Sequence, residues 1–236
     1  MKTAPVTLDH TLSALHNTLV QLSKWGCRGF DCSPQSLAIL KKWTDPMDAQ
    51  AVGEELDAIR SDLGECTRCG LSAKRTHLVF GEGDPKAELM FVGEGPGQEE
   101  DRSGKPFVGP AGQLLTRIIE AMHLTRDQVY ICNVVKCRPP DNRNPEPVEI
   151  QTCRPFLDRQ IKAVAPKVIC TLGSVATKVL LDTDQAVSRL RGRFHEYDGI
   201  KVMPTYHPAY LLREPDQKRL VWDDMKKIMA LLRIPL

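Results

Sequence analysis

The chain has 236 residues, of which 42% are hydrophobic, and this length suits one globular domain with a sizeable core plus an appendage. The formal net charge is only +2, so any contact with a nucleic acid must come from a local basic patch. Eight cysteines are too few for a disulfide scaffold in a chain of this length, and no apolar run approaches the roughly 18–20 residues of a membrane span.

Residues 1–60 are predicted to form a small helical extension. Lys2 is followed by Asp9 and His10 before any apolar stretch develops, unlike a signal peptide, so we expect a protein of the reducing cytoplasm. Further helices are expected from Ser33 and over residues 47–62. A stripe of leucines near the start of the chain favours packing of a helix within the extension. The alternative is that residues 1–60 dock a protein partner. The stripe has the spacing of an amphipathic helix and comprises Leu8, Leu12, Leu15, Leu19 and Leu22.

Residues 61–236 alternate between strand-like and helix-like segments. Such alternation predicts an α/β fold in three layers, α/β/α, with a central and mostly parallel sheet. Asp198-Gly199 marks a hairpin turn between strands at 193–197 and 200–204. The other predicted strands are 89–92, 129–132 and 167–172, and the predicted helices are 111–123, 147–164, 173–181 and 217–232.

Polar and glycine residues follow the predicted strands at their carboxyl ends, where open α/β sheets bind ligands. Gly93 to Gly97 follow the first strand, Asn133 the second, Gly173-Ser174 the third, and His207 the last. We therefore expect an acid, an amide and an imidazole to converge at one edge of the sheet.

Each of these features also has a purely structural interpretation. The turn G-E-G-P-G resembles a phosphate-binding turn but lacks the lysine of a P-loop. The carboxylates after it could be a solvated face, Asn133 could be a strand cap, and His207 could be structural. Phe107 lies between glycines and prolines, where it could pack within its loop or stack on a planar ligand.

Four cysteines have the pattern of a metal or iron–sulfur site: Cys66, Cys69, Cys137 and Cys153. Spacing alone does not choose between zinc and iron–sulfur, whereas Cys132 and Cys170 are expected to be buried thiols within strands. Basic residues near these four cysteines suggest a surface that faces a polyanion, and they comprise Arg68, Lys136, Arg138, Arg143 and Arg154.

Three long motifs resemble those of the family 4 uracil-DNA glycosylases, the iron–sulfur members of their superfamily. The motifs are G-E-G-P-G-Q-E-E-D-R-S-G-K-P-F-V-G-P-A-G, N-V-V-K-C-R-P-P-D-N-R and H-P-A-Y-L-L-R, and the four cysteines match in order and approximate spacing. The resemblance covers about residues 62–233. It implies the α/β/α uracil-glycosylase fold and a [4Fe-4S] cluster on the four cysteines, with zinc as the alternative.

The resemblance also implies roles for single residues. Phe107 would stack on a flipped-out uracil, Asn133 would read its edge, and His207 would stabilise the leaving anion, with Gly95 contributing a backbone amide. Glu94 or Glu100 would act on water, and Glu94 would also contact the base. Phosphate contacts would come from Lys136, Arg138, Arg143 and Arg213. Leu211 or Leu212 would be the wedge that enters the duplex.

The implied reaction is hydrolysis of the N-glycosidic bond of deoxyuridine, in single- or double-stranded DNA, by a monomer. Two alternatives remain: a glycosylase for another deaminated base such as hypoxanthine, and a non-catalytic iron–sulfur module that binds DNA.

The motifs also depart from those of better-known relatives. Gly95 stands where many carry a water-activating Asp, and residues 189–195 lack the K-R-R-I-H insertion of relatives that bond covalently to DNA, which disfavours a covalent trap.

Overall fold

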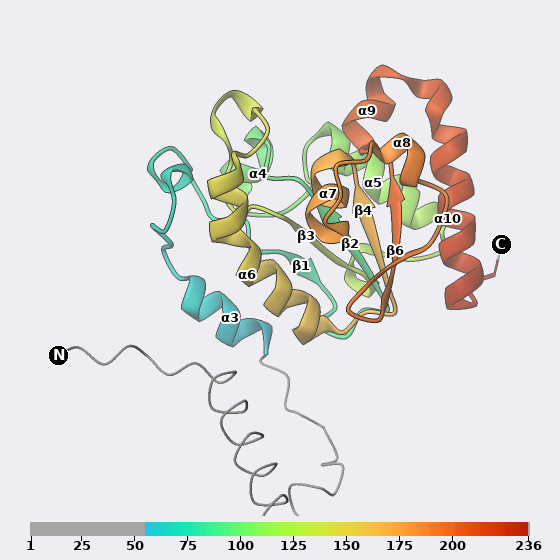
Figure 1. The fold of residues 1–236 in the computed structure, drawn as a ribbon, viewed down its shortest axis with the longest axis horizontal. Helices are drawn as coiled ribbons and strands as arrows, with labels where there is room; N and C mark the ends of the chain where they lie inside the picture. The colour runs from blue at the N-terminus through green and yellow to red at the C-terminus, as the bar shows by residue number, and fades with distance from the viewer. Residues whose placement is uncertain (1–54, 236) are drawn as a thin grey trace, which may run out of the picture. The chain divides into compact units, whose positions relative to one another are not determined.

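The computed structural model describes residues 55–235, so the predicted helices of residues 1–54 and a partner bound there lie outside the described residues. A six-stranded sheet forms its centre, with strand order β1-β3-β2-β4-β6-β5 (Figure 1). The four central strands run parallel, and the two edge strands are antiparallel to their neighbours. The strands are β1 (Glu82–Gly83), β2 (Leu89–Gly93), β3 (Tyr130–Asn133), β4 (Val168–Leu172), β5 (His195–Tyr197) and β6 (Ile200–Thr205).

Helices cover both faces of the sheet, which confirms the three-layer α/β/α prediction (Figure 1). The α-helices are α3 (Leu56–Leu63), α4 (Gln98–Ser103), α5 (Pro110–Ala121), α6 (Pro147–Val164), α7 (Ser174–Leu181), α8 (Val187–Leu190), α9 (Pro208–Arg213) and α10 (Lys218–Leu232). Short 3-10 helices are η1 (Gly70–Ala73), η2 (Arg126–Gln128), η3 (Pro140–Asn142) and η4 (Pro215–Gln217).

The buried strands divide their side chains between two cores. In β2, Leu89 and Phe91 face the core that α5 and α10 cover, while Met90 and Val92 face the core under α6 and α7. This alternation follows from the two-residue period of a strand, and full burial on both faces explains why β2 is continuously apolar in sequence.

A third, smaller core anchors the start of the described chain. Ile59 and Leu63 of α3 are buried with Phe80 and with Phe156 of α6. Helix α3 therefore packs on the α/β unit, although the sequence placed residues up to 60 in the extension. Within residues 55–235, no helix is both long and apolar enough to cross a membrane.

Candidate active site and cysteine site

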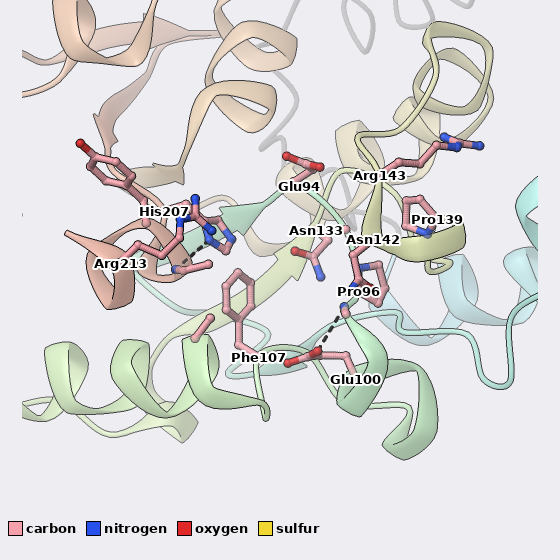
Figure 2. A pocket seen from close by; sticks show the side chains of 15 residues that line it. Glu94, Pro96, Glu100, Phe107, Asn133, Pro139, Asn142, Arg143, His207 and Arg213 are labelled. Carbon is pink, nitrogen blue, oxygen red and sulfur yellow. Dashed lines mark hydrogen bonds between the residues drawn. The ribbon is translucent and has the colours of Figure 1, made fainter. Parts of the chain in front are cut away.

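A cleft of about 470 Å³ opens at the carboxyl ends of the parallel strands, where the sequence predicted the site (Figure 2). It brings together side chains that are far apart in the chain. They come from the turn after β2, the loop before α5, the end of β3 and the start of α9. The predicted residues in its lining are Glu94, Gly95, Glu100, Phe107, Asn133, Arg143, His207 and Arg213.

Glu100 organises the floor of this cleft. Its Oε1 accepts hydrogen bonds from the backbone N–H groups of Val108 and Gly109, both at 2.9 Å, and its Oε2 accepts one from Gly97 at 3.1 Å. A carboxylate that accepts three backbone donors is held in place and ties α4 to the loop before α5. Of the two candidate carboxylates, Glu100 is therefore the one held in place by the backbone.

Phe107 lies in that loop in a strained backbone conformation, with φ of +52°. Arg126 holds the strained segment, because its guanidinium donates to the carbonyls of Pro106 at 2.7 Å and Phe107 at 3.1 Å. Gly112 is required beneath it, since a Cβ there would lie 1.9 Å from the Phe107 carbonyl. Phe107 is only 6% exposed, yet it lines the cleft, so it packs within its loop and faces the cleft at the same time.

Asn133 ends β3 with its side-chain oxygen pointing into the cleft (Figure 2). Asn133 Oδ1 is the one buried side-chain N or O atom among the described residues that has no hydrogen-bond partner. Burying an unpaired acceptor costs about 1–3 kcal/mol, which points to a ligand that donates to it. Gly93 makes room for this arrangement, since a Cβ there would lie 2.4 Å from both Asn133 Oδ1 and Phe107 Cζ.

His207 faces Phe107 across the cleft, with ring centroids 5.7 Å apart. It is the N-cap residue of α9, where its Nδ1 accepts a hydrogen bond from the backbone N–H of Ala209 at 3.1 Å. Burial lowers the pKa of the His207 imidazole from 6.5 to about 4, so the ring is neutral at pH 7. A neutral ring that accepts at Nδ1 carries its proton on Nε2.

Glu94 is the cleft carboxylate without a fixed structural task. Among residues 55–235 its side chain has no hydrogen-bond or ion-pair partner, and it lines the cleft opposite Phe107 (Figure 2). Burial raises the pKa of its carboxyl above the ordinary value of 4.5. Asp101, the acidic residue that follows Glu100, accepts from the backbone of Thr76 at 2.8 Å and does not line the cleft.

The predicted DNA contacts divide into accessible and inaccessible groups. Arg213 lines the cleft and forms no ion pair with any described residue. Arg143 also lines it, but its guanidinium binds the buried Glu149 at 2.7 and 2.9 Å and so also fixes the start of α6. Arg138 is half-buried in the loop after β3, where its side chain donates to Asn142 at 2.8 Å.

Two of the predicted DNA contacts are wrong. Lys136 is 1% exposed, so its ammonium cannot reach a phosphate in this structure. Leu211 is fully buried in the core under α9, whereas the neighbouring Leu212 is 44% exposed. The side chain available as a wedge is therefore Leu212.

The four predicted cysteines line a second, small cavity beside η1 and the start of α6. Apolar residues close it, among them Leu71, Val135 and Phe156. Burial raises the pKa of the Cys137 thiol to about 11, so a cation at the site would be needed to hold a thiolate there. Among residues 55–235, no three His, Cys, Asp or Glu side chains are gathered as ligands of a single metal ion.

The cations around this cavity differ partly from those expected. Arg75, which the sequence analysis missed, donates to Cys137 Sγ at 3.3 Å, and the carbonyl of Cys66 accepts from it at 2.5 Å. Arg68 binds the end of α3 and lies over the Phe156 ring, and Lys136 lines the cavity. Arg138, Arg143 and Arg154 are not among its lining residues, and Arg154 donates to the carbonyl of Val179 on α7.

Comparison with known proteins gives a consistent family. Residues 80–226 match the uracil DNA glycosylase superfamily. The chain is 47% identical to the type-4 uracil-DNA glycosylase of Sulfurisphaera tokodaii, over 77% of this chain and 87% of that protein. It is 44% identical to the type-4 uracil-DNA glycosylases of Saccharolobus solfataricus, over 76% and 87% of the two chains, and of Thermotoga maritima, over 76% and 96%.

Proposed function

The chain belongs to the type-4 uracil-DNA glycosylases of the uracil-DNA glycosylase superfamily, and we propose how its cleft releases uracil from DNA. As a uracil-DNA glycosylase it is a hydrolase of N-glycosyl bonds that acts in base excision repair. The reaction hydrolyses the bond between uracil and deoxyribose and leaves an abasic site. The base has to leave the stack first, because this bond is inaccessible within a duplex.

The unpaired Oδ1 of Asn133 is the observation that carries the proposal. Uracil presents N3–H and O4 on its edge, so Oδ1 accepts from N3–H while the amide nitrogen donates to O4. Cytosine presents an acceptor and a donor in the reverse order, and a fixed amide rejects it. The ring of Phe107, held by Arg126 and Glu100, supplies the face on which the base stacks.

His207 then stabilises the leaving base. Cleavage places negative charge on uracil, and the Nε2–H of a neutral imidazole donates to O2, where that charge develops. The backbone amide of Gly95 is a second donor in the same cleft. Because Nδ1 is already engaged by Ala209, the ring needs no reorganisation during the reaction.

Glu94 orients or activates the attacking water and offsets the positive charge on the sugar. Its position in the cleft, its lack of a side-chain partner among residues 55–235 and its raised pKa support this role, whereas the carboxylate of Glu100 is occupied by three backbone donors. Glu100 acts indirectly, by holding the Phe107 loop. Arg213, Arg143 and Arg138 bind phosphates, and the exposed Leu212 fills the gap left by the flipped base.

The four cysteines are proposed to hold a [4Fe-4S] cluster. The four thiols line one pocket, and their match in order and approximate spacing to the cluster ligands of the family to which the chain belongs favours the cluster over zinc. Cys137 directly precedes the loop that carries Arg138 and Arg143, and Cys153 lies in the second turn of helix α6, which follows that loop, so the cluster would brace the loop from both sides. Because hydrolysis transfers no electrons, the bound cluster supplies structural bracing to this reaction and no redox step.

Free thiols at these positions agree with a reducing compartment, and we place the protein in the cytoplasm. One chain supplies every residue of the cleft, so we propose that it works as a monomer on single- or double-stranded DNA.

A base-release assay on purified protein tests this function. Oligonucleotides that each carry one uracil, hypoxanthine or cytosine are incubated with the protein, and abasic sites are counted. Release from the uracil substrate alone supports the proposal, and faster release from hypoxanthine would replace it with a different deaminated base. Binding to DNA without release would indicate the non-catalytic module.

A further inference from the structure

A buried lysine lies between the cysteine cavity and the amide that faces the base. Lys136 follows β3 and immediately precedes Cys137. Its side chain is among the largest fully buried ones and lines the same cavity as the four cysteines. Neither the hydrolysis nor the binding of phosphates uses it.

Lys136 is fixed at the backbone of the recognition residue. Its Nζ donates to the carbonyl oxygen of Asn133 at 2.6 Å and to Oε1 of Gln160 at 2.5 Å. The first bond spans the turn after β3, so it restrains the residue whose side-chain Oδ1 faces the cleft. A displacement of about 1 Å at such a residue can cost on the order of 100-fold in rate.

Gln160 in turn has no freedom to rotate. Its Nε2 donates to the carbonyl of Phe80 at 3.0 Å and to the hydroxyl of Tyr130 at 3.1 Å, which leaves its oxygen facing Lys136. Gln160 is itself 0% exposed. The ammonium is therefore held from two sides by acceptors that cannot turn away.

These acceptors are neutral, and that leaves the charge of Lys136 uncompensated. Lys136 forms no ion pair with a carboxylate anywhere in residues 55–235. Its side chain instead lines the same pocket as Cys69, Cys137 and Cys153. A buried ammonium without an anion is costly, whereas four thiolates around a [4Fe-4S] cluster carry net negative charge.

We propose that Lys136 is a positioning residue that serves both sites: it is the buried counter-cation of the cysteine-bound cluster, and it holds Asn133 in register for uracil. This inference rests on the proposed function, because it takes the cluster and the role of Asn133 from it. Occupancy of the cysteine site and reading of the base are then linked through one side chain.

The two halves of the proposal can be separated by two substitutions in the full-length, cluster-loaded protein. Lys136→Met removes the charge and the bond to Asn133 together. Gln160→Met removes one support of the ammonium and leaves the charge beside the cluster. Lys162→Met, on the exposed face of the same helix as Gln160, is the matched control.

Three quantities are measured for each protein: the single-turnover rate of uracil release, the reduction potential of the cluster and the temperature of unfolding. We expect Lys136→Met to release uracil about 10–100-fold more slowly and to have a more negative potential, because a nearby cation favours the reduced, more negative cluster. Gln160→Met should release uracil more slowly with an unchanged reduction potential. Lys162→Met should match the wild type in both the rate and the reduction potential.

A Lys136→Met protein with the wild-type rate and potential would overturn the inference while leaving the proposed function intact. If that variant does not fold, Gln160→Met decides: a wild-type rate in it would show that the network does not position Asn133. A wild-type protein that holds no iron or releases no uracil would overturn the proposed function and, with it, this inference.

Discussion

The backbone N–H of Ala209 donates to Nδ1 of His207 across 3.1 Å, and this single contact fixes which nitrogen of the imidazole carries the proton. The proton must lie on Nε2, the nitrogen left free to face the cleft. The same contact caps α9, so the residue that begins this helix is also the proposed anion-stabilising donor. Residues Pro208 to Arg213 form a helix, which is not among the helices predicted from the sequence.

Two substitutions of His207 test its capping of α9 and its Nε2–H group separately. His207→Ala should slow single-turnover cleavage by on the order of 10²–10³, the usual cost of losing an anion-stabilising donor. It should also lose about 1 kcal/mol of stability with the cap. His207→Asn restores a capping side chain but brings no Nε2–H, so it should recover stability and remain slow. Recovery of the rate in His207→Asn would contradict the role of Nε2.

The depressed pKa of His207 predicts how stability depends on pH. The unfolded chain takes up a proton near pH 6.5 and the folded chain only near pH 4, so this residue costs stability as the pH falls between these values. At pH 5 the loss is about 2 kcal/mol relative to pH 7.5. The difference in unfolding free energy between wild type and His207→Asn should shift by that amount in denaturant titrations. An unchanged difference would mean that the folded imidazole titrates normally.

The two carboxylates of the cleft should respond differently to the same substitution. Glu94→Gln should bind uracil-containing DNA normally and cleave slowly, because Gln keeps the size but cannot accept a proton. Glu100→Gln places an NH₂ group against backbone donors, so it should loosen the Phe107 loop and lose uracil binding. Single-turnover kinetics and equilibrium binding distinguish these outcomes. Full rates in both variants would remove the water-activating role from either side chain.

The cysteine site predicts a brown protein with about four irons per chain. Cys137→Ala or Cys153→Ala should lower iron content, solubility and DNA binding together, because the basic loop between the two residues loses its anchor. Cys132→Ala, a buried strand thiol outside the cavity lining, is the control and should keep its iron. Colourless, zinc-loaded protein from anaerobic preparation would reject the cluster.

The long elements could be predicted because their periodicity is strong. Helix α6 matches its predicted bounds of 147–164, and the hairpin at Asp198-Gly199 joins β5 and β6 as expected. The six-residue helices α4 and α9 were missed, since one or two turns carry too little periodicity to be recognised. For the same reason the sequence could not decide which of Leu211 and Leu212 faces the core.

The site residues could be predicted by their position at strand ends, but their individual tasks could not. The role of Glu100 depends on backbone donors that lie three to nine residues away in a loop of irregular shape. In the sequence, Lys136 resembles a surface cation in a basic loop. Its ammonium is held by Gln160, which lies 24 residues later and is brought beside it only by the fold. Arg75 and Arg126 carry no motif, and their contacts with Cys137 and the Phe107 loop arise from the fold alone.

The proposed recognition of uracil depends most directly on the amide of Asn133, and single-turnover uracil release by Asn133→Ala tests it. Two hydrogen bonds of about 1.4 kcal/mol each are lost, so the rate should fall by about 100-fold. DNA affinity should change little, because phosphate contacts supply most of it. A variant that binds DNA normally and releases uracil about 100-fold more slowly is the predicted result. Near-normal release would contradict the account and leave Asn133 as no more than the end of a strand.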